Sequence, residues 1–62
     1  MTFSDYLTQR RIGEAKELLK NTAMKMSDIA FEVGYSHQSY FGRKFRQFTG
    51  MTPLRFRKAN QP

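Results

Sequence analysis

Side chains that donate hydrogen bonds recur at helical spacing in the second half of the 62-residue chain. Ser39, Arg43 and Arg46 are spaced i, i+4 and i+7, so a helix would place them on one face. Gln47 lies beside them, and Gln38 falls in the first turn of the same segment. An Arg guanidinium matches guanine O6 and N7, a Gln amide matches adenine N6 and N7, and a Ser hydroxyl can pair with several base edges. The chemistry that this pattern favours is hydrogen bonding to the edges of base pairs.

The charge of the chain indicates the same kind of partner. Lys and Arg number 11 against 5 Asp and Glu, which gives a formal net charge of +6. No acidic side chain follows Glu32, and residues 33–62 contain six of the basic ones: Arg43, Lys44, Arg46, Arg55, Arg57 and Lys58. An imbalance of this size in so short a chain favours a polyanionic partner.

The composition also excludes several classes of protein. With no Cys and one His, the chain lacks disulfides, thiolate chemistry and the usual zinc ligands. One His and scattered Ser and Thr form no recognisable pair of nucleophile and base, so we predict no enzyme, no catalytic residue, no metal and no cofactor. No apolar run approaches the roughly 18 residues that a membrane span needs. We therefore expect one soluble, cytoplasmic domain without membrane contact.

A long helix is predicted within residues 1–22. Between residues 3 and 19 the apolar side chains gather on one arc at 100° per residue: Leu7, Ile12, Ala15, Leu18 and Leu19. Thr2 or Ser4 can cap the start of this helix, and residues 21–22 end it.

One basic residue violates this pattern. Arg11 projects into the apolar arc, where an unpaired guanidinium is costly. Two interpretations have equal weight: a pair with Asp28 or Glu32, or a long stem that covers apolar surface while its head stays in water.

Residues 23–62 are predicted to form a second unit, with helices over 27–33, 37–48 and 53–58. The first has apolar residues at i, i+3, i+4 and i+7, namely Met26, Ile29, Ala30 and Val33. Gly34 ends it, because a residue without a Cβ adopts a left-handed conformation most easily. The next has Ser36 or His37 as its cap and an inner stripe of Phe41, Phe45 and Phe48. The last helix begins with Thr52 as its cap and Pro53 in its first position, and its Phe56 points inward.

Two short helices joined by a Gly-containing turn, the second with a donor face, constitute a helix-turn-helix. We predict an all-α, homeodomain-like helix-turn-helix fold in which the long N-terminal helix precedes three shorter ones. The donor-bearing helix would enter the major groove of duplex DNA. Phosphates would be met by the helix N-terminus at Thr52 and by Arg55 and Arg57.

Two long segments carry a resemblance to a known family. "YLTQRRIGEAKELL" and "MSDIAFEVGYSHQSYFGRKFRQFTGMTPLRFR" are similar to the C-terminal part of the DNA-binding region of the AraC/XylS family of bacterial transcription regulators. The shared pattern is an Ile-Ala helix, a Gly-aromatic turn, a Ser-Tyr-Phe helix and a Gly-x-x-Pro ending. The resemblance covers nearly the whole chain, and it implies a linker helix followed by the second of two helix-turn-helix units.

The resemblance also implies roles for single residues. The helix over 37–48 becomes the recognition helix, with base contacts from His37, Gln38, Ser39, Gly42 and Arg43. Phosphate contacts are expected from Arg46, Thr52, Arg55, Arg57 and Lys58. Gly42 stands where the family commonly has a small hydroxyl residue, and His37 where it often has an acidic or small polar one. An exposed helix-end His is an equally good interpretation of His37.

The partners follow from the same resemblance. We expect double-stranded promoter DNA as the ligand and RNA polymerase as a further candidate. A first helix-turn-helix and a sensor or receiver domain are expected in a longer parent protein. Phe31 lies off the buried arc of its helix, so we expect it to pack on a neighbouring helix or on the absent unit. The alternative is that it stays exposed to solvent.

Two alternatives belong to other classes. The chain would be a protein-interaction module if its basic face docks on an acidic partner such as a polymerase subunit. Exposed Phe31 and the polar side of the first helix would serve that function. A cationic helix on a membrane surface is less favoured, because the phenylalanine stripe is needed as core.

Overall fold

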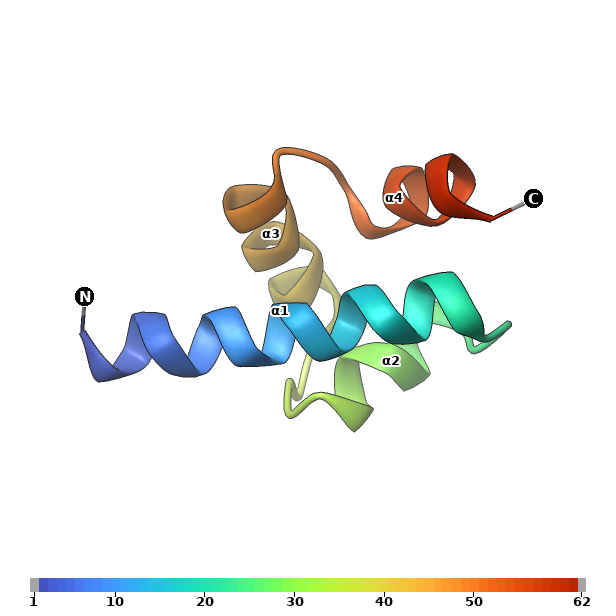
Figure 1. Cartoon of the computed structure of the whole chain (residues 1–62). Helices are drawn as coiled ribbons and strands as arrows, with labels where there is room; N and C mark the ends of the chain where they lie inside the picture. Colours follow the sequence, from blue (N-terminus) through green and yellow to red (C-terminus); the bar gives the residue numbers. More distant parts are fainter. Residues whose placement is uncertain (1, 62) are drawn as a thin grey trace.

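The computed structural model describes residues 2–61 as four helices without a strand among them. They are α1 (Phe3–Asn21), α2 (Met26–Glu32), α3 (Gln38–Thr49) and α4 (Pro53–Asn60). In Figure 1, α1 crosses the molecule, with α2 on one side and α3 and α4 on the other. The all-α helix-turn-helix prediction is confirmed. The predicted ranges 27–33, 37–48 and 53–58 differ from α2, α3 and α4 by at most two residues at an end.

The core lies where the second half of α1 meets the other three helices. Its buried members come from α1, from α2 and the turn after it, and from α3: Ile12, Ala15, Leu19, Ile29, Ala30, Val33, Tyr35, Phe41 and Phe45. Phe48 and Phe56, which were predicted to point inward, are half-buried and pack against this cluster. Leu7 departs from the predicted arc, because 36% of it is exposed on a part of α1 that projects beyond the other helices.

Local sequence sets both ends of α1. Thr2 and Asp5 form a capping box, in which Asp5 N–H donates to Thr2 Oγ1 at 3.1 Å and Thr2 N–H donates to Asp5 Oδ2. At the other end the backbone N–H of Thr22 closes the last turn on Leu18 O. Two side chains from the C-terminal end of the chain also cover this helix end. Arg57 and Gln61 both donate to the carbonyls of Leu19 and Thr22.

The turn between α2 and α3 is a Schellman motif. Gly34 has φ 105°, Gly34 N–H donates to Phe31 O, and Tyr35 N–H donates to Ala30 O at 2.8 Å. Gly34 is needed here for a second reason, since a Cβ would lie 3.0 Å from Nε of Arg11. The motif redirects the chain sharply, so that α3 starts after only a few residues and crosses α1.

The structure excludes one of the two surroundings predicted for Arg11. Within residues 2–61 no carboxylate lies within 4 Å of its guanidinium, so the proposed pair with Asp28 or Glu32 is wrong. The guanidinium instead lies over the Tyr35 ring, with Cζ 5.3 Å from the ring centroid. An aromatic face attracts a cation through its quadrupole, so this position partly replaces the water that Arg11 gives up.

Phe31 does not pack on a neighbouring helix. Its side chain is 77% exposed on α2, which corrects that part of the sequence-based expectation.

Across the described residues, no helix is long and apolar enough to cross a bilayer.

Candidate nucleic-acid interface

The inner face of α3 is fixed by a continuous series of aromatic contacts. Phe41 and Phe45 are completely buried, with their ring centroids 5.8 Å apart. Tyr35 packs on Phe41 at 5.8 Å, and Phe56 meets Phe45 edge-on at 5.4 Å. Tilted and edge-to-face pairs at these distances add to the burial of the rings. The rotation of α3 about its own axis is therefore set by rings from the turn and from α4.

The outer face of α3 bears the predicted donors. Ser39, Arg43, Arg46 and Gln47 are all exposed, and none takes part in a side-chain hydrogen bond or ion pair within residues 2–61. Their donors are therefore free for a ligand. Together with the flanking Gly42, we call these residues the outer face.

A shallow depression adjoins this outer face where α3 approaches the start of α4. It is lined by residues from both elements: Gly42, Arg43, Arg46, Gln47 and Thr52. Gly42 leaves space on this side, since a Cβ built there would meet no atom within 4 Å. Two guanidinium groups therefore flank a surface with no side chain at its Gly42 position.

The N-terminus of α4 provides the second part of the candidate site. The hydroxyl of Thr52 accepts from Arg55 N–H at 3.2 Å, and Pro53 fills the first position of the helix. Arg55 and Lys58 are exposed. Because the positive end of a helix favours anions, this end suits a phosphate.

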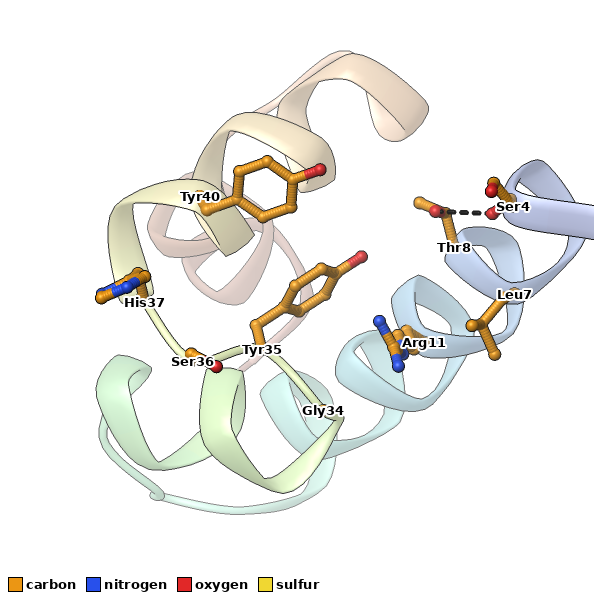
Figure 2. A pocket seen from close by; sticks show the side chains of 9 residues that line it. All are labelled: Ser4, Leu7, Thr8, Arg11, Gly34, Tyr35, Ser36, His37 and Tyr40. Carbon is orange, nitrogen blue, oxygen red and sulfur yellow. Dashed lines mark hydrogen bonds between the residues drawn. The ribbon is translucent and has the colours of Figure 1, made fainter.

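His37 and Gln38 occupy the start of α3, and both are exposed. His37 is the N-cap residue by its extended backbone, but its side chain makes no capping hydrogen bond. In Figure 2 its ring points away from Tyr35 and Tyr40. The His37 side chain therefore lies on the surface, which is compatible both with a base contact and with an exposed histidine at a helix end.

Arg57 differs from the other basic residues assigned to phosphate. Its Nε donates to Leu19 O at 3.2 Å and its Nη2 to Thr22 O at 3.1 Å. These bonds tie α4 to the end of α1, and the side chain is half-buried. Sequence reasoning missed this structural role, because the two acceptors are backbone carbonyls, which every residue has.

The geometry defines a helix-turn-helix unit: α2, a Schellman turn and α3 with a free donor face, supported by α1 and α4. Comparison with known proteins agrees. A family model described as "Helix-turn-helix domain" matches residues 1–59.

Relatives of known name extend the comparison. The chain is 40% identical over 60 residues to the HTH-type transcriptional activator RhaR of Escherichia coli strain K12, covering 97% of this chain and 21% of RhaR. Among solved structures, it resembles the C-terminal domain of the two-component response regulator YesN from Fusobacterium nucleatum. The TM-score is 0.90 at 40% identity, over 92% of this chain and 55% of the other. A protein of unknown function from Listeria innocua has a TM-score of 0.93 at 43% identity, over 98% and 58%.

The chain belongs to the AraC-type helix-turn-helix family, as the resemblance of its two long segments predicted. This is a family of DNA-binding transcription regulators and not of enzymes. The chain spans about a fifth of the length of RhaR and little more than half of the two solved relatives.

Proposed function

We propose that this chain binds double-stranded promoter DNA in a sequence-specific manner, with α3 as the recognition helix in the major groove. One observation carries the proposal: complete burial of Phe41 and Phe45 turns Ser39, Arg43 and Arg46 outward together. The major groove is about 12 Å wide and admits one α-helix. The N-terminus of a recognition helix contacts base edges in this fold class.

Each part of the surface then has a separate task. Base contacts come from the N-cap residue His37 and from the first two turns of α3: Gln38, Ser39, Gly42 and Arg43. Phosphate contacts come from Arg46 and from the start of α4: Thr52, Arg55 and Lys58. Contacts of the second kind hold the register of α3 without selecting a sequence. We omit Arg57 from this set because two of its nitrogens already donate to carbonyls.

Selection from a random duplex library tests the proposal. The chain is expected to enrich a short motif, and Arg43→Ala to lose the preference at one base pair of that motif. Arg55→Ala is the matched control, because it removes an exposed guanidinium from the proposed phosphate set and should leave the motif unchanged. Failure to enrich any motif at near-physiological salt would refute sequence-specific binding.

A second candidate function is contact with a partner protein such as RNA polymerase. The observation that favours it is Phe31, whose ring is 77% exposed on α2 with charged neighbours Glu32 and Asp28. In cells that express a regulator containing this chain, Phe31→Ala should lower transcription from a target promoter while promoter occupancy stays constant. A parallel fall in occupancy would exclude this function for Phe31.

A further inference from the structure

Gly42 lies between two hollows of the protein surface. One is the depression flanked by Arg43 and Arg46. The other, which we call the Gly42 hollow, has a volume of about 210 Å³ and lies where α2, α3 and α4 begin. Apart from Gly42, its lining is mostly apolar: Met26, Phe41, Pro53 and Leu54. The two hollows share Gly42 and Thr52, so they adjoin each other on the surface.

The missing side chain of Gly42 keeps the space above α3 open. A Cβ built at this position meets no atom within 4 Å, so packing inside the chain leaves room for a larger residue. Gly in a helix also lowers its stability relative to Ala. A glycine allows another molecule to approach the backbone closely. The space over Gly42 is therefore available to a group of a ligand.

The walls of the Gly42 hollow select for an apolar group. Leu54 is 52% exposed, so part of its side chain is in contact with water. An apolar group that enters the hollow removes this surface from water, which is favourable. A polar group in the same place would give up hydrogen bonds to water and receive none from Met26 or Leu54.

The neighbours of the hollow on α3 are the side chains proposed to contact bases. Gln38 also lines it and precedes Gly42 by one helical turn, so the two residues share a face. With α3 in the major groove, the hollow faces the edges of base pairs. Thymine presents a C5-methyl group there, whereas the purines present N7 with O6 or N6, and cytosine its amino group. Among these, the thymine methyl group fits an apolar wall.

We propose that the Gly42 hollow receives the C5-methyl group of one thymine, so that Gly42 sets a preference for thymine at one position of the DNA site. The inference rests on the proposed function, because it requires α3 to lie in the major groove. Gln38 and Arg43 read other bases by hydrogen bonds. Gly42 reads a base by leaving space for an apolar group, which is a different source of specificity on the same helix.

Duplexes that lack single methyl groups test the proposal. The starting duplex is the one that the whole chain selects from a random library, and each of its thymines is replaced in turn by deoxyuridine. Deoxyuridine keeps the base pair and lacks only the C5-methyl group. Fluorescence anisotropy is expected to show about fourfold weaker binding at the position read by Gly42, the effect of leaving one methyl-sized group unburied.

Three variants assign this effect to the Gly42 hollow. Gly42→Ala places a methyl group of the protein in the open space, so the ratio of the two affinities at that position should fall to about one. Gly13→Ala is the matched control, because it changes the other helical glycine that has no atom within 4 Å of a built Cβ, and it should keep the fourfold ratio. Leu54→Ala shortens the wall and should reduce the ratio to about twofold. Circular dichroism checks that each variant keeps the fold.

The outcomes separate this inference from the proposed function. A selected duplex in which no thymine shows the difference would overturn the inference and leave sequence-specific binding intact. A difference that persists in Gly42→Ala would place the methyl group elsewhere and would also overturn it. Equal weakening of thymine and deoxyuridine duplexes by Leu54→Ala would assign the hollow to a deoxyribose instead. If no motif is enriched at all, the proposed function fails, and this inference fails with it.

Discussion

The two faces of α3 have the same backbone and opposite surroundings. On one face Phe41 and Phe45 have no exposed surface, whereas on the other Ser39, Arg43 and Arg46 are exposed without an intramolecular partner. Burial of the rings stabilises the domain and sets the rotation of the helix. The outer donors contribute little to stability, because isolated surface polar groups rarely do. One helix thus separates the residues that hold it from those available to a ligand.

The largest effect is expected at the inner face. Phe45→Ala removes a fully buried ring that contacts Phe41 and Phe56, and should lower the free energy of unfolding by about 3–5 kcal/mol. A loss of this size approaches the whole stability of a small domain. Urea denaturation followed by circular dichroism measures it. A well-folded Phe45→Ala chain with unchanged midpoint would contradict the assignment of α3's inner face as core.

The matching change on the outer face should affect binding alone. Arg43→Ala should weaken the preferred duplex by about 1–3 kcal/mol, the cost of losing a bidentate contact to guanine. Its midpoint in urea should stay close to that of the parent chain. Fluorescence anisotropy with preferred and scrambled duplexes measures the difference. Equal losses on the two duplexes would show that Arg43 contacts phosphate and not a base.

The variant Arg57→Ala tests whether this basic residue stabilises the fold, like the inner face of α3, or contacts DNA, as proposed for the outer face. Arg57→Ala should lower the free energy of unfolding by about 1–2 kcal/mol, since it removes two charged donors from carbonyls at the end of α1. Gln61 donates to the same carbonyls and limits the loss. Arg55→Ala, an exposed neighbour on α4, is the control and should leave the urea midpoint unchanged. A stable Arg57→Ala chain that binds DNA poorly would return Arg57 to the phosphate set.

Arg46→Ala should weaken binding to all duplexes by the same factor, whatever their sequence. Each phosphate contact contributes about 0.9 to the slope of log K against log salt, so Arg46→Ala should reduce that slope by about this amount. Binding isotherms between low and near-physiological salt provide the slope. An unchanged slope, or a loss confined to the preferred duplex, would instead indicate a base contact.

The smallest effect is expected from replacing two glycines at positions where packing does not require the absence of a side chain. Neither Gly13 on α1 nor Gly42 on α3 has an atom within 4 Å of a built Cβ, so Ala at either should stabilise its helix by about 1 kcal/mol. Only Gly42→Ala places a methyl group on the outer face. It should lose DNA affinity while Gly13→Ala keeps it. Full affinity in both variants would mean that the backbone at Gly42 does not approach the DNA closely.

Periodic local patterns account for what could be predicted from the sequence. Apolar residues at helical spacing indicated the helices, and the lack of a Cβ at Gly34 marked the turn that its positive φ now displays. The phenylalanine spacing indicated which side of α3 faces the core, because that side follows from 100° per residue once the helix is known. The outer donors followed from the same geometry.

Contacts between distant parts of the chain could not be predicted in this way. Arg11 meets Tyr35, and Arg57 meets carbonyls of Leu19 and Thr22 at the end of α1. A long basic side chain has many accessible rotamers, so its partner cannot be read from the sequence. Every residue has a backbone carbonyl, so the sequence does not show which carbonyls accept the hydrogen bonds. The depression beside Gly42 likewise depends on how α4 meets α3. The exposure of Leu7 depends on where the neighbouring helices stop, which helical periodicity does not describe.

The central claim is that the outer face of α3 is the DNA-contacting surface, and a duplex titration followed by amide chemical shifts tests it most directly. At near-physiological salt, the account predicts the largest shifts at Ser39, Arg43 and Arg46 and at the start of α4. Core amides such as Leu19 should barely move. Shifts concentrated on α1 or around Phe31, with the outer face of α3 unchanged, would contradict the account.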